Sequence, residues 1–308
     1  MISLNPDRII LGCGNFGGVG STPSLIGFGE TKSQAFQLLD AAKGYGILQF
    51  DTANSYGGGL SEDYLGQWIQ QQTPSYRHTL EISTKVGNPF ATTAEFNPLS
   101  FHEINLHLQN SLNRLGIDRI KTYYLHQPDF KTPLQETLQA LDQALMAGDI
   151  ETIGLSNVDL HYVQRFLSYC NSSVRRAVRY VQNEFHFLKQ IDKFDLIPFL
   201  VKEKINYVAF SPLAGGLLTG KYQSPGSPPI GSRLDLRPEP YENYRNTESS
   251  MQIREFIKLA RSYGQDAAAF ALDFVLQTNG IHSAIIGPRR KEHFENFGFK
   301  RARYLGST

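Results

Sequence analysis

Four side chains that can exchange protons or carry charge occur at corresponding points of the sequence. Asp51, Lys85 and His126 each lie at or next to the end of a short apolar stretch. Tyr56 follows Asp51 by five residues. A strand-end aspartate is commonly only a turn or cap residue, and a lone lysine is commonly a solvated charge. Ionisable groups on buried strands are costly unless they pair or become neutral, so their coincidence on successive stretches indicates a shared site.

Together these four side chains suit the reduction of a carbonyl group. A tyrosine hydroxyl has a pKa of about 10, and a nearby ammonium group lowers that pKa by favouring the phenolate. Lys85 would supply this charge to Tyr56, while Asp51 would hold and orient the lysine. His126 would donate a hydrogen bond to the carbonyl oxygen and orient it. The set predicts that Tyr56 protonates a developing alkoxide in a site that needs a hydride donor.

The order of apolar and amphipathic segments predicts how these residues are brought together. Eight apolar runs are nearly continuous rather than alternating, as in strands that are covered on both faces. The runs are residues 8–14, 47–53, 80–86, 120–126, 150–156, 179–185, 205–212 and 281–288. Between most of them, apolar residues recur at three- and four-residue intervals and predict helices. Such patterns include residues 33–45, 101–116, 134–148 and 251–264.

This alternation predicts an α/β fold, a (β/α)8 TIM barrel that spans residues 1–308 as one domain with long cofactor and substrate loops. The alternative architecture is an open doubly wound sheet, which usually carries a G-x-G-x-x-G fingerprint before its first helix. The glycines from Gly12 to Gly18 lack this spacing, and no helical pattern begins before about Thr31. The barrel is therefore favoured, with its site at the C-terminal ends of the strands.

Two segments are longer than the connections of a simple barrel need. Residues 17–30 and 222–249 are rich in Gly, Pro and Ser. The first also carries apolar residues, and the second carries arginines and tyrosines. A long loop is either a solvated connection or a segment that closes over a ligand, and this composition favours ligand contact.

Composition limits the classes of function. Hydrophobic residues make up 41% of the 308 and charged residues 19%, which is enough for a substantial core. The net charge of +1 gives no support to nucleic-acid or membrane binding. Cys13 and Cys170 share no disulfide or metal-ligand spacing, so no metal is expected. The N-terminus has no signal pattern, and no apolar run approaches about 18 residues, so a cytoplasmic protein is expected.

The segments around these residues resemble the motifs of the aldo-keto reductase family, in the family's order. "FDTANSYGGGLSEDYLG" at 50–66 resembles the motif with the family's catalytic tyrosine, and "ISTKVG" at 82–87 resembles its lysine strand. "YYLHQPD" resembles its histidine strand, and "IGLSN" and "VQNEF" its contacts to the nicotinamide amide. "VAFSPLAGGLLTGKY" resembles its seventh-strand cofactor loop. The matches run from about residue 8 to 300, so the resemblance implies the family's fold and chemistry for the whole barrel.

The resemblance implies a role for each matching residue. Tyr56 becomes the general acid, Lys85 and Asp51 become its supporting pair, and His126 orients the carbonyl. A nicotinamide cofactor would lie across the barrel mouth. The residues that match its contacts are Gly14, Asn15, Phe16, Asp51, Ser156, Asn157, Gln182, Phe210, Ser211, Leu213, Gly215, Lys221, Gly287, Arg289, His293 and Asn296. Among them, Phe210 would stack on the nicotinamide ring, where family members commonly have tyrosine.

The eighth-strand loop bears on the choice of cofactor. Arg289, with Arg290 as a second candidate, matches the basic residue at the 2′-phosphate of NADPH. NADP(H) is therefore expected in preference to NAD(H). Counting on from Gly287, Phe297 takes the place of an adenine-contacting asparagine, and Asn296 comes one residue earlier. A one-residue deletion in the loop or a changed adenine contact would account for this difference.

The function implied is the reversible, NADPH-dependent reduction of a small aldehyde or ketone, with substrate and oligomeric state left open. The alternative is a nucleotide-binding regulatory or scaffold protein on the same fold, like the channel-associated β subunits. A third interpretation, an isomerase or phosphate-processing barrel, leaves the Tyr, Lys, Asp and His set unexplained.

Overall fold

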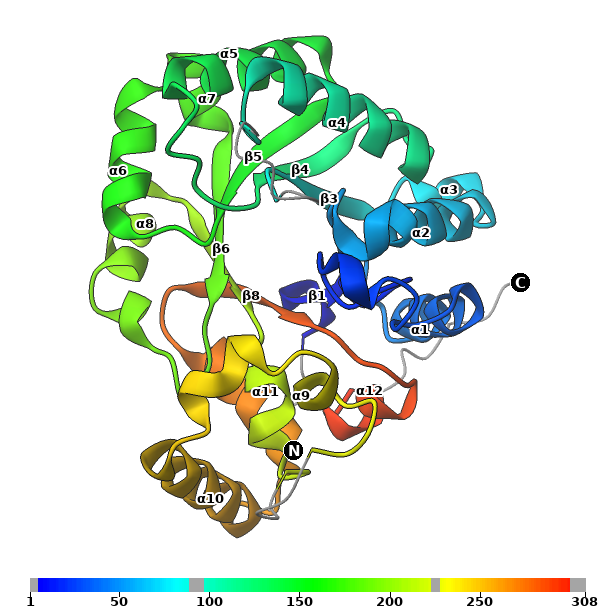
Figure 1. The fold of residues 1–308 in the computed structure, drawn as a ribbon, viewed down its shortest axis with the longest axis vertical. Helices are drawn as coiled ribbons and strands as arrows, with labels where there is room; N and C mark the ends of the chain where they lie inside the picture. The colour runs from blue at the N-terminus through cyan, green and yellow to red at the C-terminus, as the bar shows by residue number, and fades with distance from the viewer. Residues whose placement is uncertain (1–4, 89–96, 223–227, 300–308) are drawn as a thin grey trace.

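The computed structural model describes residues 5–88, 97–222 and 228–299, in which eight parallel strands close into a barrel in chain order (Figure 1). The strands are β1 (Ile9–Gly12), β2 (Gln49–Asp51), β3 (Glu81–Val86), β4 (Ile120–Leu125), β5 (Ile150–Ser156), β6 (Val178–Glu184), β7 (Asn206–Phe210) and β8 (Ile281–Ile286). The barrel closes where Ile10 of β1 pairs with Ile285 of β8. Each strand lies within one residue of a predicted apolar run, so the predicted (β/α)8 barrel is confirmed.

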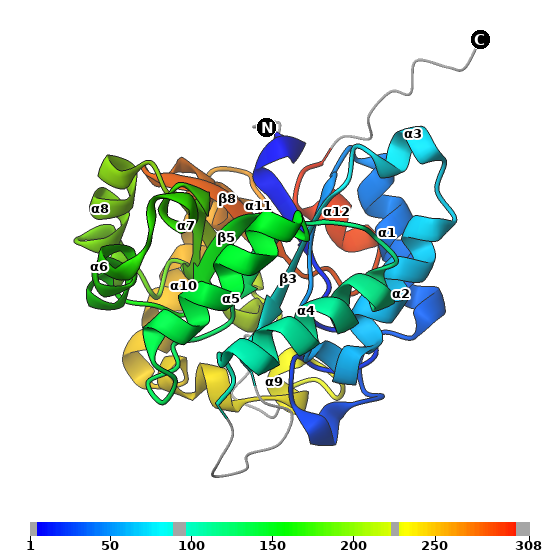
Figure 2. The same ribbon diagram turned by 90° about the horizontal axis from the view of Figure 1, so that it is seen from above.

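Helices surround the barrel, and their ends follow from local sequence (Figures 1 and 2). They are α1 (Lys32–Gly44), α2 (Leu60–Gln70), α3 (Pro74–Arg77), α4 (Phe101–Leu115), α5 (Leu134–Ala147), α6 (Leu160–Tyr169), α7 (Ser172–Ala177), α8 (Leu196–Glu203), α9 (Arg233–Leu236), α10 (Thr247–Ser262), α11 (Ala267–Gln277) and α12 (Glu292–Asn296). Thr31 and Gln34 form a capping box at the start of α1. Gly116 and Gly148 take left-handed conformations that end α4 and α5.

The barrel strands are buried on both faces, which explains their continuous apolar runs. A large core fills the layer between strands and helices, and a smaller cluster of Ile10, Val208 and Ile285 forms where β1, β7 and β8 meet. None of the helices that the structure describes is both long and apolar enough to span a bilayer. The assignment of residues 1–308 to one domain stays a prediction, because both ends lie outside the described residues.

The two long segments lie at one end of the barrel, opposite the N-terminus, as the positions of α9 and of the chain before α1 show in Figure 2. Residues 17–30 contain a short 3-10 helix, Pro23–Leu25. The second segment includes residues outside the described ranges, but 228–246 contains α9 and a 3-10 helix, Glu239–Tyr244. Helix α10 begins before the predicted residue 251 because Asn246 caps it, accepting a 2.8 Å hydrogen bond from the amide of Ser249.

Candidate active site

A sharp glycine turn directs the chain after β2. Gly57, Gly58 and Gly59 all have positive φ, a conformation that side chains rarely allow. A Cβ atom on Gly57 would lie 2.5 Å from the carbonyl oxygen of Phe16. The turn therefore presses against the loop after β1 and places Tyr56, the residue just before it, beside that loop.

The ammonium group of Lys85 is the centre of the buried polar cluster. Its Nζ donates to Asp51 Oδ2 at 2.5 Å, to the carbonyl of Thr52 at 2.8 Å and to the Tyr56 hydroxyl at 3.4 Å. The Lys85 side chain is fully buried, and that of Asp51 is 5% exposed. All three ammonium hydrogens have an acceptor, so the positive charge is fixed beside Asp51 and Tyr56.

Electrostatics in this cluster favour a charged lysine and a protonated tyrosine. Burial alone would lower the pKa of Lys85, but Asp51 and Tyr56 raise it, and the net shift is upward. Burial raises the pKa of Tyr56, and the charge of Lys85 offsets this only in part. The expected fall in the Tyr56 pKa therefore does not occur in the protein alone, because desolvation of the phenolate outweighs the nearby ammonium group.

His126 packs its ring edge-on against Tyr56. The ring centroids are 5.5 Å apart, and the planes are inclined by 83°. Burial, and then the charges of Lys85 and Arg237, hold the pKa of His126 well below its usual range. The imidazole is therefore neutral at neutral pH. Its Nδ1 is buried and has no hydrogen-bond partner among the residues that the structure describes.

The residues expected to hold the nicotinamide amide are bonded to this cluster. Gln182 donates to Asp51 Oδ1 at 3.0 Å, and the hydroxyl of Ser156 donates to the backbone carbonyl of Gln182 at 2.8 Å. The side chain of Asn157 donates to the carbonyl of His126, also at 2.8 Å. These contacts join β5 and β6 to the strands that carry the proton-handling groups.

One cavity of about 820 Å³ contains most of the predicted site. Its wall includes every residue of the predicted catalytic and cofactor sets except Phe16 and Lys85, and it does not include Arg290, the second candidate for the 2′-phosphate. Phe16 is 2% exposed and belongs to the hydrophobic core, so its side chain does not reach the cavity. Lys85 lies behind Asp51 and Tyr56. The cavity is large enough for an extended cofactor together with a small substrate.

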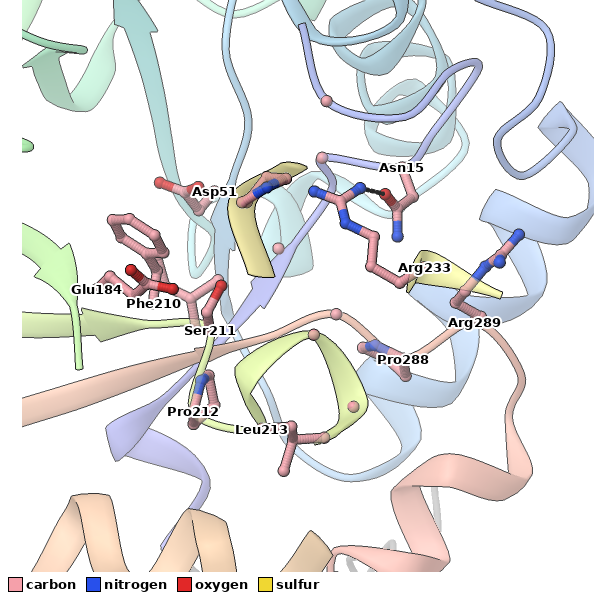
Figure 3. Close-up of a pocket in the computed structure, with 18 of the residues that line it drawn as sticks. Asn15, Asp51, Glu184, Phe210, Ser211, Pro212, Leu213, Arg233, Pro288 and Arg289 are labelled. Carbon is pink, nitrogen blue, oxygen red and sulfur yellow. Dashed lines mark hydrogen bonds between the residues drawn. The ribbon is translucent and has the colours of Figure 1, made fainter. Parts of the chain in front are cut away.

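The loop after β7 forms one side of the cavity, where Phe210, Ser211 and Leu213 lie in Figure 3. Ser211 and Gly215 have positive φ, and a Cβ atom on Gly215 would lie 2.5 Å from the ring of Tyr241. Consecutive turns of this kind expose backbone N–H groups to an anion. The loop is thus suited to the pyrophosphate contact expected from the sequence.

The eighth-strand loop differs in one respect from the expectation. Arg289 donates to buried Glu30 at 2.7 Å and to the carbonyl of Gly231 at 2.5 Å. Burial raises the pKa of Glu30, while Arg289 opposes the rise. A 2′-phosphate would therefore have to share Arg289 with a carboxylate. The side chain of His293, also in the cavity wall, accepts a hydrogen bond from the Arg289 amide.

The misaligned adenine position falls on two neighbouring residues of the cavity wall. Asn296 and Phe297 both line the cavity. Phe297 is 3% exposed and stacks edge-on with Phe299, so its ring belongs to the core. Asn296 is thus the residue of the two that offers a polar side chain to an adenine ring.

Several cavity residues were not identified from the sequence. They include the polar residues Ser21, Asn88, Gln127, Arg233 and Arg237. Arg233 points to Asn15 and donates a 3.1 Å hydrogen bond to its side-chain oxygen (Figure 3). The only signal for the two arginines was the Gly-, Pro- and Ser-rich composition of residues 222–249, together with the arginines and tyrosines of that segment. Within the described ranges, no group of three or more His, Cys, Asp or Glu could hold a metal ion.

Comparisons with known proteins relate this chain to one family. The family model described as "Aldo/keto reductase family" matches residues 8–298. An uncharacterized oxidoreductase, YrpG, of Bacillus subtilis is 31% identical, with 95% of this chain and 86% of the relative covered. An L-glyceraldehyde 3-phosphate reductase of Escherichia coli K12 is 29% identical, with 84% and 76% covered.

Two further comparisons concern the cofactor and the fold. An aldo-keto reductase of Schizosaccharomyces pombe whose name includes NADP(+) is 28% identical, with 91% of this chain and 82% of the relative covered. Among solved structures, a glycerol dehydrogenase of Gluconobacter oxydans superposes with a TM-score of 0.77 at 23% identity. That match covers 97% of this chain and 88% of the other, and it shows the same fold.

Proposed function

This chain belongs to the aldo/keto reductase family of oxidoreductases, and from that premise we propose that it reduces an aldehyde or ketone to an alcohol, reversibly, with NADPH. The observation that carries the proposal is the Tyr56 hydroxyl, which is 3.4 Å from the buried ammonium group of Lys85 in the wall of the cavity. A proton donor beside a fixed positive charge suits a reaction in which an alkoxide forms and is protonated.

Tyr56 acts as the general acid. Its raised pKa keeps the hydroxyl protonated at neutral pH, so the proton is present when the carbonyl oxygen gains charge. As the proton leaves, the phenolate forms next to Lys85, whose charge stabilises it. Asp51 holds the lysine in position and keeps it protonated. The chain of hydrogen bonds from Asp51 through Lys85 to Tyr56 therefore supports proton donation to the substrate during reduction. It equally supports proton removal from the alcohol in the reverse reaction.

His126 orients the carbonyl. Its neutral imidazole carries one N–H, and the ring stands edge-on to Tyr56 in the cavity wall. A carbonyl oxygen that accepts hydrogen bonds from both side chains is polarised and directed towards the tyrosine proton. Burial, and then charge repulsion with Lys85, lower the pKa of His126 and favour the neutral histidine that this role requires.

The cavity residues fit a nicotinamide dinucleotide. Ser156, Asn157 and Gln182 offer amide and hydroxyl groups to a carboxamide, and Phe210 offers an aromatic face. NADPH supplies the hydride when it is bound. The cations Lys221 and Arg289 lie in the same wall, and their positive charges support a phosphate-bearing cofactor. The name of the Schizosaccharomyces pombe relative gives NADP(+) as the cofactor of that protein.

A nicotinamide-absorbance screen tests the function. NADPH and NADH are each supplied with a panel of aldehydes, ketones and sugars, and the oxidised cofactors with alcohols. Because one relative is named for L-glyceraldehyde 3-phosphate, small hydroxyaldehydes and their phosphates belong on the panel. We expect oxidation of NADPH by at least one carbonyl compound. NADPH binding without turnover on any compound would instead support the regulatory interpretation.

A further inference from the structure

A guanidinium group without an acidic partner lies in the cavity. Arg237 follows α9 directly and lines the cavity together with Tyr56 and His126. Its side chain is partly buried, and within residues 5–88, 97–222 and 228–299 it makes no side-chain hydrogen bond or ion pair. A partly desolvated charge with no partner is costly for the protein, so its presence in a site calls for a ligand of opposite charge.

Backbone contacts place Arg237 on the Tyr56 side of the cavity. A Cβ atom on Gly20 would lie 2.6 Å from Nη1 of Arg237, so the guanidinium packs against the Gly20 backbone. Gly20 accepts a 3.0 Å hydrogen bond from the amide of Gly57, the residue after Tyr56. It also donates to the carbonyl of Gly14, whose Cα faces the Tyr56 ring. Gly20 therefore links the guanidinium of Arg237 to two segments beside Tyr56. One is the turn that begins at Gly57, and the other is the loop that contains Gly14.

The carboxylates of the cavity wall do not neutralise Arg237. Asp51 accepts hydrogen bonds from Lys85 and Gln182, Glu184 pairs with Lys189, and Asp266 caps α11. Arg233, in the same segment, donates a hydrogen bond to the neutral side-chain amide of Asn15. These three acids therefore do not oppose the positive potential beside Tyr56. Burial and the charge of Arg233 lower the pKa of Arg237, and Tyr241 and Glu239 offset this only in part.

We propose that Arg237 binds an anionic group, a carboxylate or a phosphate, on the carbonyl substrate whose oxygen faces Tyr56 and His126. This inference rests on the proposed function and adds the substrate class to it. A guanidinium matches the planar or tetrahedral oxygens of both anions with two parallel N–H donors. Neighbouring Ser21 and Asn88, which are hydrogen-bonded to each other at 3.2 Å, add neutral polar groups to the same wall.

Two matched substrate pairs test this specificity. One pair is 4-carboxybenzaldehyde and 4-(hydroxymethyl)benzaldehyde, and the other is glyceraldehyde 3-phosphate and glyceraldehyde. We expect the wild type to prefer the anion of at least one pair, and the pair concerned identifies the carboxylate or the phosphate. Arg237→Met should lower the ratio of kcat/KM for anionic over neutral substrate by about ten- to a hundredfold, the effect of losing a charged hydrogen bond.

Matched variants separate recognition from general effects of charge. Arg237→Lys should keep part of the preference, because the charge remains while the paired donors are lost. Arg245→Met removes the same charge from an exposed position eight residues later, outside the cavity wall, and should leave the ratio unchanged. The proposal is overturned if Arg237→Met keeps the wild-type ratio for both pairs, or if the wild type prefers neither anion.

Equilibrium binding distinguishes failure of this inference from failure of the proposed function. Calorimetry with 4-carboxybenzaldehyde and the protein–NADP+ complex needs no turnover. Weaker binding to Arg237→Met by about tenfold or more would support the anion site even if no carbonyl is reduced. If instead the variant loses NADPH affinity by that factor, Arg237 belongs to the cofactor site and the inference is wrong.

Discussion

Gln182 donates a 3.0 Å hydrogen bond to Asp51, which ties β6 to β2 across the mouth of the barrel. The other carboxylate oxygen of Asp51 accepts from Lys85. One buried aspartate therefore fixes both a residue expected at the nicotinamide and the residue that positions the proton donor. A displacement on either side is transmitted to the other through two short contacts. Asp51 therefore fixes the position of Gln182, the proposed nicotinamide contact, relative to Lys85, which positions the proposed proton donor.

Replacing Tyr56 with phenylalanine tests proton donation. The ring and its edge-on contact with His126 are kept, and only the hydroxyl is lost. We expect kcat for carbonyl reduction to fall by about a thousandfold or more, while the Kd for NADPH changes by less than about twofold. Steady-state rates and fluorescence titration measure the two quantities. A variant with near-normal turnover would remove Tyr56 from the mechanism.

Replacing Lys85 with methionine should affect both rate and stability. The phenol loses the charge that stabilises its anion, and Asp51 is left as a buried, unpaired carboxylate. We expect a loss of turnover close to that of Tyr56→Phe and a free energy of unfolding lower by about 3–5 kcal/mol. Urea unfolding measures the second effect.

The double variant Lys85→Met with Asp51→Asn separates these effects. It removes the unpaired charge, so part of the stability should return while activity stays lost. Equal stability of the single and double variants would show that Asp51 does not carry an uncompensated charge when Lys85 is absent.

The neutral state of His126 gives a pH-dependent contribution to stability. Its pKa is depressed in the folded protein, so the unfolded chain binds the proton more readily. The free energy of unfolding should then fall as the pH drops below the unfolded value of about 6.5. His126→Asn should have a shallower decline between about pH 7 and pH 5 than the wild type. His282, whose pKa is also lowered, serves as a comparison outside the cavity wall through His282→Asn. Identical slopes for His126→Asn and wild type would contradict the assignment.

The ion pair between Glu30 and Arg289 should weaken the preference of the wild-type protein for NADPH over NADH. Glu30→Gln frees Arg289 from an acidic partner, so a 2′-phosphate gains a full positive charge. We expect the ratio of the NADH to the NADPH dissociation constant to rise by about fivefold, which is about 1 kcal/mol. Arg289→Met should lower the same ratio. Glu295→Gln, which removes an exposed acid from α12, is the control. An unchanged ratio in both test variants would place the 2′-phosphate elsewhere.

Most of the fold could be predicted from the sequence, because a strand that is buried on both faces appears as a continuous run of apolar residues. Each apolar run became a barrel strand, and the polar residues at the strand ends met at one mouth. Asp51, Lys85 and His126 could be grouped because the topology brings strand ends together whatever the loops do.

Contacts between loops that are distant in sequence could not be predicted, because no local sequence pattern indicates them. Glu30 and Arg289 are 259 residues apart in sequence, and Arg237 reaches the cavity only because its segment folds against Gly20. Phe16 was expected at the cofactor because it matches the family's first-strand loop together with Gly14 and Asn15, yet its side chain lies in the core. The direction of the Tyr56 pKa shift was also missed, since it depends on the extent of burial and not only on which charge is near.

The groups that handle protons stand on or beside strands, whereas Arg233 and Arg237 belong to residues 228–246. The residues proposed for proton transfer and those proposed for substrate recognition therefore lie in different parts of the chain. If the proposals above hold, an exchange of this one segment should change which carbonyl compound is preferred, and it should also shift the pKa of His126, which the charge of Arg237 helps to lower. The architecture makes the chain a practical starting point for engineered reductases.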